Sequence, residues 1–421
     1  MSETIIPACA GKNIVICCDG TSNQLDGEFS NVAKLYSVLV KDPARQVVYY
    51  DPGVGTMGDS RLVSGVARAV SKGLGMAFGA GFAENLSDAY AFLMDTYEEG
   101  DCVYMFGFSR GAFTVRALAA ILHTCGLVEK RNQNLLPYIF PLHMKSFEGT
   151  RDEERAGKAA DDAEATGGNT PQGGELPDDR GAPAPSVLPA RRGRVTGSQA
   201  AARFKSIYSR PVWPHYLGVW DTVTSLGWVY RRTYYPFSTY NPDVRIVRHA
   251  VSIDERRAQF RSNLWHRAVG QDVRQVWFAG VHSDVGGGYP EVESGLSKIP
   301  LAWIAAEAHQ AGLLIDPAKY DQVVLGKGGQ YVPPDPAAMQ HSSLKGPWWA
   351  LEYLPGRGPR KQTPLRLPLA RRRTLPRGSI VHQSVYDRMA AVPDYHPANL
   401  FDANGQPLKF KVEPYPAPPF Y

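Results

Sequence analysis

Three segments follow one another without a gap between residues 102 and 123, and they constrain the fold more than any other part of the chain. The apolar run 102–106 is typical of a buried strand, and the alanine-rich run 112–123 predicts a helix. Between them stands Gly107-Phe108-Ser109-Arg110-Gly111, a Gly-x-Ser-x-Gly pattern. So short a turn needs glycines on both sides of the serine, because side chains there would collide with the strand and the helix. Ser109 is therefore the candidate nucleophile; the alternative is an ordinary turn serine that caps the helix.

The remaining structured sequence alternates between short apolar runs and helical patterns. Further strands are predicted at residues 13–18, 46–50, 215–220 and 276–281, and further helices at 31–40, 83–97 and 244–260. Alternation of this kind predicts the α/β class. We expect an α/β-hydrolase-like domain with a mostly parallel central sheet and helices on both faces.

Composition divides the chain into a domain and two weaker segments. Residues 148–202 hold few large apolar side chains and many Gly, Pro and charged residues, which predicts a disordered insert. We expect one catalytic domain made of residues 1–147 and 203–325. An irregular C-terminal extension, 326–421, follows, with a lid or a packed arm as its candidate role. The Gly/Ala-rich stretch 63–82 is either a lid or lipid-facing helix or a helix packed through its small residues.

A serine hydroxyl needs a base to take its proton, and ligands of parallel sheets sit beyond the carboxyl ends of the strands. His282 follows the strand predicted at 276–281 and precedes three glycines, so it is the candidate base; the alternative is a polar turn residue. Asp221 ends the strand at 215–220 and is the candidate acid, with Asp254 as the alternative. Asp284 is expected to support the turn or its backbone. Serine, acid and histidine then follow the chain order of α/β-hydrolases.

Two backbone segments are candidates for binding an oxyanion. The N–H of Arg110 lies near the start of the helix at 112–123, where the helix dipole favours negative charge. The turn Asp19-Gly20-Thr21 follows the first strand and can supply a second N–H from Gly20 or Thr21. A purely structural turn is the alternative for this segment.

Several longer motifs occur in a defined order over roughly residues 12–310, apart from the insert. They are Cys18-Asp19-Gly20-Thr21 with Asn31-Val32, Tyr50 to Thr56, Gly107 to Arg116, Gly218 to Val223, His249 to Arg257, and Gly280 to Tyr289. This set resembles the DUF2235 family, which contains the catalytic domain of the Tle1-type phospholipase effectors of type VI secretion. The resemblance implies a Ser-Asp-His hydrolase of phospholipid acyl esters, with Ser109, Asp221 and His282 at the matching positions. It also implies, as candidates, export by type VI secretion and a secretion-system or immunity partner.

Two other functions stay open. One is a small-ester hydrolase, or a catalytically silent binding protein, of the same fold. The other is a phosphatase of the haloacid-dehalogenase type, because residues 14–21 approach the start of that family. In this chain, however, Cys17 stands where those phosphatases have the nucleophilic aspartate.

Charge and cysteine usage limit the partners. A net charge of +5, from 46 Lys+Arg and 41 Asp+Glu, permits contact with a membrane surface but does not indicate nucleic acid. The five cysteines show no zinc-like spacing, so we expect reduced thiols and no metal or cofactor. The N-terminus lacks the order of a signal peptide, and no apolar window reaches the ~18 residues of a membrane span, which predicts synthesis in the cytosol.

Overall fold

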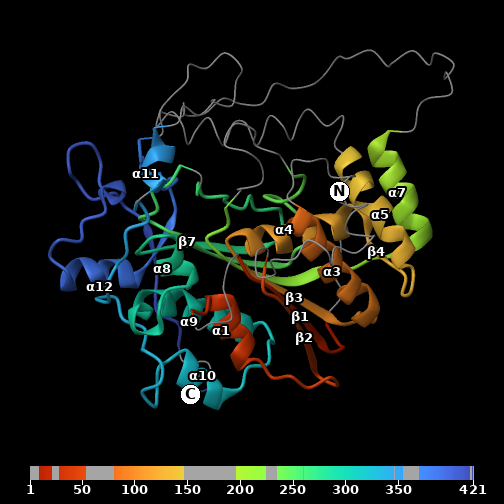
Figure 1. Cartoon of the computed structure of the whole chain (residues 1–421), viewed down its shortest axis with the longest axis horizontal. Coiled ribbons are helices and arrows are strands. Elements are labelled where there is room, and N and C mark those ends of the chain that lie inside the picture. The colour runs from red at the N-terminus through yellow and green to blue at the C-terminus, as the bar shows by residue number, and fades with distance from the viewer. Residues whose placement is uncertain are drawn as a thin grey trace, which may run out of the picture.

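The computed structural model describes residues 9–20, 28–53, 80–146, 196–223, 235–258, 260–345, 347–353, 369–417 and 420. Within them, eight strands form one sheet in the order β10-β9-β8-β7-β6-β3-β1-β2 (Figure 1). All neighbouring pairs in it are parallel, which confirms the α/β class and the mostly parallel sheet. The strands are β1 (Asn13–Cys18), β2 (Gln46–Asp51), β3 (Cys102–Phe108), β6 (Pro214–Trp220), β7 (Ile246–Ser252), β8 (Asp272–Phe278), β9 (Ile380–His382) and β10 (Lys411–Glu413). A separate antiparallel pair joins β4 (Leu127–Val128) to β5 (Ser209–Arg210).

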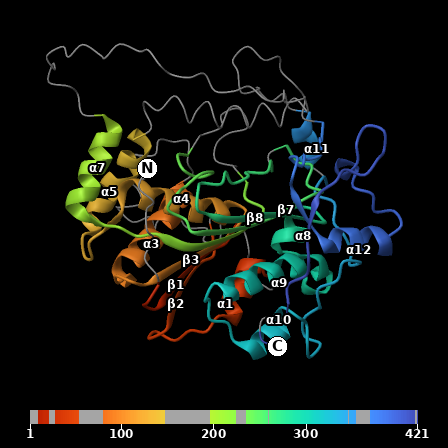
Figure 2. The same ribbon diagram turned by 180° about the vertical axis from the view of Figure 1, so that it is seen from behind.

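Helices cover both faces of the sheet, as Figures 1 and 2 show from opposite sides. On one face lie α3 (Ala80–Thr96), α4 (Arg110–Cys125), α5 (Leu136–Lys145) and α7 (Gly197–Tyr208); on the other lie α1 (Asn31–Val38), α9 (Gly295–Gln310) and α10 (Pro317–Val323). Alternate residues of β1 pack into the two resulting cores, Ile14 and Ile16 into one, Val15 and Cys17 into the other. A strand buried on both sides must be apolar throughout, which is why β1 and β3 are the clearest strands of the sequence.

The shorter elements are α8 (His282–Gly286), α11 (Pro347–Glu352), α12 (Gln383–Ala391) and the 3-10 turns Gln133–Leu135, Glu291–Glu293 and Ala398–Leu400. Among the described helices, none combines the length and the apolar character that crossing a membrane requires.

The helix predicted at residues 244–260 is wrong, because Ile246–Ser252 is the strand β7 between β6 and β8. Two polar side chains inside this strand interrupt its apolar run, so the sequence pattern does not indicate a buried strand. Arg248 is buried and pairs with Glu307 (2.6 Å), and His249 is buried and accepts the N–H of Thr222 (3.3 Å). With these partners, a polar pair can occupy a central strand that would otherwise be continuously apolar.

The two weaker segments contain more structure than expected. Helix α7 begins inside the stretch expected to be a disordered insert, where Thr196 and Gln199 form a capping box. Residues 147–195 lie outside the described part of the chain. The extension after residue 325 is not irregular throughout, since β9 and β10 continue the main sheet beyond β8. The stretch 63–82 lies outside the described residues apart from its last three, which begin α3.

The cysteines divide into two groups. Cys17, Cys18 and Cys125 are buried free thiols, as expected. The expectation of reduced thiols is wrong for the other two, because Cys9 and Cys102 form a disulfide across 93 residues of sequence. Nothing in the spacing of these two residues reveals the pair, since only the fold brings the N-terminal segment to the start of β3.

Candidate active site

Ser109 occupies the turn between β3 and α4 and has a strained backbone, with φ 57° and ψ −117°. The flanking glycines have no room for a side chain. A Cβ atom on Gly107 would lie 2.5 Å from the carbonyl oxygen of Gly111, and one on Gly111 would lie 2.1 Å from that of Cys18. The turn therefore packs directly onto the end of β1, for the steric reason anticipated from the sequence.

Gly111→Ala is expected to lower the free energy of unfolding by about 3 kcal/mol, because the added methyl group overlaps backbone atoms that cannot move aside. Equilibrium unfolding in urea measures this. Gly270→Ala is the matched control: Gly270 has φ +82° but open space around its Cα, so only backbone strain of about 1–2 kcal/mol is expected. Equal losses in the two variants would contradict the steric explanation.

Ser109, His282 and Asp221 come from the carboxyl ends of β3, β8 and β6, and the structure brings them into one hydrogen-bonded series. The Ser109 hydroxyl donates to Nε2 of His282 (2.8 Å), and Nδ1–H of His282 donates to Oδ2 of Asp221 (2.5 Å). All three side chains are buried. The carboxylate fixes the imidazole tautomer, which leaves the lone pair of Nε2 facing the hydroxyl.

A fourth residue, Arg373, completes the surroundings of Asp221. Its Nη1 and Nη2 donate to the two carboxylate oxygens (2.5 and 3.1 Å), and the N–H of Ser252 donates to Oδ1 (3.0 Å). Burial by itself would raise the pKa of Asp221, but the charge of Arg373 and the hydrogen bond from His282 outweigh it and hold the pKa below its usual range. Sequence reasoning misses Arg373, because it lies 152 residues beyond Asp221 in a basic run.

The imidazole of His282 lies between two aromatic rings. The ring centroid of Phe108 is 4.6 Å away, and that of Phe260 is 4.8 Å away in an edge-on arrangement. Glu255, just after β7, accepts the backbone N–H of His282 (3.2 Å) and forms an ion pair with Arg257 (2.8 Å). The imidazole ring of His282 is thus in contact with Phe108 of β3 and with Phe260, and the start of α8 is held by Glu255.

Asp254 and Asp284 both hold the backbone of the loop that carries His282, and neither is bonded to its ring. Asp254, the alternative acid, accepts the N–H of Gly280 and the hydroxyl of Tyr395 (both 2.8 Å). Asp284 accepts the N–H of Val281 (3.0 Å) and pairs with Nδ1 of His341 (2.6 Å). Burial raises the pKa of both carboxyl groups. This geometry favours Asp221 over Asp254 as the acid.

Of the oxyanion candidates, Arg110 is the first residue of α4, and first-turn N–H groups have no acceptor within their own helix. Gly20 lies beside the candidate nucleophile: a Cβ atom on it would be 3.2 Å from Cβ of Ser109. Its N–H, however, donates to Oδ1 of Asp19 (2.7 Å), so in this structure it is not free to donate to an oxyanion. Asp19 also accepts the hydroxyl of Tyr50 (2.9 Å), which makes it a support of this turn. Thr21 lies outside the described residues.

A pocket of about 260 Å³ adjoins the loop that carries His282. Val281, the residue before the histidine, lines it on one side. Arg256 and Arg372 supply positive charge, and Ser342 and Trp349 belong to the same lining. The pocket thus combines cationic, carboxyl, hydroxyl and aromatic groups beside the residue that precedes His282.

The chain is similar to several known proteins. A family model described as "T6SS, Phospholipase effector Tle1-like, catalytic domain" matches residues 12–307. The "Uncharacterized protein YEL023C" of Saccharomyces cerevisiae is 31% identical over 260 residues, which are 60% of this chain and 32% of that protein.

Two solved structures are also similar. An uncharacterized protein from Pseudomonas aeruginosa has 18% identity and a TM-score of 0.38, over 73% of this chain and 47% of that one. The Tle1 effector bound to the VgrG spike of the type 6 secretion system has 17% identity and a TM-score of 0.29, over 69% of this chain and 53% of that one. This chain therefore spans about half the length of the solved chains and about a third of the yeast protein.

Proposed function

Because the chain belongs to the family of T6SS phospholipase effector Tle1-like catalytic domains, we propose that it is a serine hydrolase of phospholipid acyl esters. The observation that carries the proposal is the buried series Ser109–His282–Asp221 at the carboxyl edge of the sheet. Family membership supports a lipolytic role, and the geometry supplies a chemistry for it.

In the proposed reaction, Nε2 of His282 takes the proton of Ser109 while Oγ attacks the ester carbonyl carbon. The N–H of Arg110 stabilises the oxyanion that forms. His282 then gives the proton to the leaving alcohol, and an acyl-enzyme remains. Water, activated by the same imidazole, releases the fatty acid and restores the serine. Asp221 keeps the tautomer and stabilises the imidazolium without taking the proton.

Charge beside the site favours a phospholipid over a small neutral ester. Arg256 and Arg372 line the pocket next to His282, and guanidinium groups match the geometry and charge of a phosphate. The phosphatase alternative loses support, because Cys17 is buried in the sheet and burial raises the pKa of its thiol well above the usual range. A thiol in that state is neither accessible nor ionised.

The test is fatty-acid release from vesicles of phosphatidylethanolamine and phosphatidylglycerol, compared with hydrolysis of p-nitrophenyl butyrate. We expect both reactions, with vesicles preferred at equal ester concentration. Cleavage of the soluble ester alone would favour the small-ester hydrolase. Inactivity on all esters would favour a binding protein, and Mg²⁺-dependent release of phosphate from a monoester would favour the phosphatase.

Family membership is also the basis for proposing export by type VI secretion, with a secretion-system partner and an immunity partner. The measurement is the amount of protein outside producing cells with and without an intact contractile sheath. Equal amounts in the two cases would contradict export by this route.

Arg373→Met is expected to destabilise the fold by about 3–5 kcal/mol near neutral pH, because it leaves the carboxylate of Asp221 buried without its cation. We also expect kcat to fall about 10²-fold with little change in KM, since a misplaced acid misplaces the imidazole. Arg371→Met, an exposed neighbour, is the matched control.

The pH dependence of stability tests the same ion pair. The folded-state pKa of Asp221 lies below its unfolded value, so its stabilising contribution is present above about pH 4 and is lost as the pH falls through the folded pKa. The difference in Tm between wild type and Arg373→Met should therefore be largest near pH 7 and shrink below pH 4. A difference that is the same at pH 3 and pH 7 would contradict the role of Arg373.

A further inference from the structure

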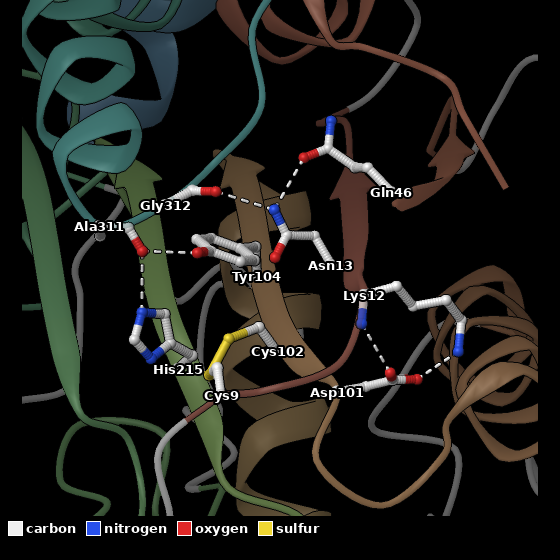
Figure 3. Close-up of a disulfide and its surroundings, with 10 residues drawn as sticks. All are labelled: Cys9, Lys12, Asn13, Gln46, Asp101, Cys102, Tyr104, His215, Ala311 and Gly312. Atoms are coloured by element: carbon white, nitrogen blue, oxygen red, sulfur yellow. Dashed lines mark hydrogen bonds and ion pairs between the residues drawn. A yellow bond between two sulfur atoms is a disulfide. The ribbon is translucent and has the colours of Figure 1, made fainter. Parts of the chain in front are cut away.

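The disulfide between Cys9 and Cys102 lies at the edge of the sheet opposite the candidate active site, beside His215 (Figure 3). Cys102 is the first residue of β3, and His215 is the second residue of β6. The two sulfur atoms and a ring nitrogen of His215 all lie within 4.8 Å of one another. Two sulfurs and one imidazole nitrogen form a donor set that zinc binds in proteins.

The imidazole of His215 is oriented as a ligand would be. Its Nε2–H donates to the carbonyl oxygen of Ala311 (3.0 Å), and Tyr104 donates its hydroxyl to the same oxygen (2.6 Å). Nε2 therefore carries the hydrogen, and Figure 3 shows the other ring nitrogen on the side of the ring away from Ala311. Metal-binding histidines commonly have their second nitrogen fixed by a carbonyl in this manner.

Contacts other than the disulfide hold Cys9 near Cys102. The N–H groups of Ala10 and Gly11 donate to the carbonyl of Gly100 (3.1 and 2.9 Å), and Cys102 donates its N–H to the carbonyl of Lys12 (3.0 Å). Lys12 also pairs with Asp101, as Figure 3 shows. Breaking the sulfur–sulfur bond therefore leaves both side chains on neighbouring, hydrogen-bonded segments. Cys102 is only 4% exposed, whereas Cys9 is exposed and leaves a path for an ion from solvent.

We propose that Cys9, Cys102 and His215 form a redox-controlled zinc site. The site cannot bind zinc while the two cysteines form the disulfide, and it can bind zinc once they are reduced to two thiols. Reduction of the Cys9–Cys102 disulfide to two thiols consumes two electrons and two protons from a dithiol reductant, which itself becomes a disulfide. Binding Zn²⁺ then releases the two thiol protons to solvent and forms two Zn–S bonds and one Zn–N bond, with water as the fourth ligand. The N-terminal segment is cross-linked to the sheet in either state, by sulfur when oxidised and by metal when reduced.

The test uses the full-length protein, oxidised or reduced with a phosphine under argon and freed of reductant. Co²⁺ serves as the spectroscopic probe, because thiolate ligation produces charge-transfer absorption, and Zn²⁺ is then added to displace it. We expect reduced wild type to bind one equivalent and the oxidised protein to bind none at this site. Cys102→Ser and His215→Gln should weaken Zn²⁺ binding by about 100-fold or more. Cys125→Ser, which removes a buried thiol elsewhere, should bind as wild type does.

Circular dichroism and thermal melting establish that each variant is folded before its affinity is compared. Binding that is as strong in His215→Gln as in wild type would overturn the three-residue site, as would equal binding by the oxidised protein or none by the reduced one. The readout does not involve ester hydrolysis, so this inference and the proposed function can fail independently.

Discussion

Ser109→Ala is expected to lower the rate of ester hydrolysis by at least about 10³-fold, because it removes the atom that attacks the carbonyl. The residual rate would come from the Arg110 N–H and from substrate binding alone. The measurement is the initial rate of fatty-acid release from phospholipid vesicles, together with covalent labelling by a fluorophosphonate. Labelling should fall from one equivalent per chain to none.

Ser87→Ala is the matched control, because Ser87 is a buried serine of α3 outside the site. It should retain wild-type labelling and activity. A Ser109→Ala protein that is folded and still reacts with the probe would exclude Ser109 as the nucleophile. Loss of labelling without loss of activity would instead show that hydrolysis occurs elsewhere in the chain.

Asp221→Asn is expected to lower kcat by about 10⁴-fold. An amide has one oxygen, and when this oxygen accepts the N–H of Ser252, the NH₂ group faces Nδ1 of His282 and donates to it, so His282 loses its tautomer. A neutral amide also does not balance the charge of an imidazolium. The substitution also leaves the guanidinium of Arg373 buried without a carboxylate, and a loss of stability of about 3–5 kcal/mol is expected with it. Steady-state kinetics on vesicles, corrected for the folded fraction from thermal melting, separates the two effects.

Asp254→Asn provides the comparison, since Asp254 is the alternative candidate for the acid. Its Oδ2 accepts from both Gly280 and Tyr395, and an asparagine oxygen in the same position can keep both bonds. We expect a loss in kcat of less than about tenfold. A larger loss for Asp254→Asn than for Asp221→Asn would reverse the assignment of the acid.

The three residues that the sequence predicts as a catalytic triad all lie at or shortly beyond the carboxyl ends of strands. Ser109 and Asp221 follow β3 and β6, whose apolar runs are unambiguous, and the glycines around Ser109 are required by backbone contacts that any such turn makes. Parallel strands bring their carboxyl ends to one edge. The meeting of Ser109, Asp221 and His282 at one edge could therefore be predicted without knowing any side-chain contact, whereas the strand order could not, because the sequence predicts a helix where β7 stands.

The features that escape prediction depend on pairs of residues distant in sequence. The strand β7 contains Arg248 and His249, whose burial makes sense only once their partners are in place. Arg373 is one of three consecutive arginines, and nothing local separates the buried one from its exposed neighbours. Cys9 and Cys102 are likewise two of five cysteines until the fold joins them. Hydrophobic pattern and secondary-structure propensity describe one segment at a time. These three features depend instead on contacts between segments that are distant in the sequence.

The two short strands after residue 325 have a practical consequence. The family model ends at residue 307, yet β9 covers the outer side of β8, and Arg373 reaches Asp221 from the same part of the chain. A protein cut at the family boundary would present β8 as a bare edge, which is a template for pairing between molecules, and would keep a buried anion with no counterion. Such a fragment should aggregate rather than form a smaller enzyme. The residues after 325 thus complete the sheet and supply the cation for a buried carboxylate within the same polypeptide, and comparisons of relatives should look for an equivalent beyond the region where similarity stops.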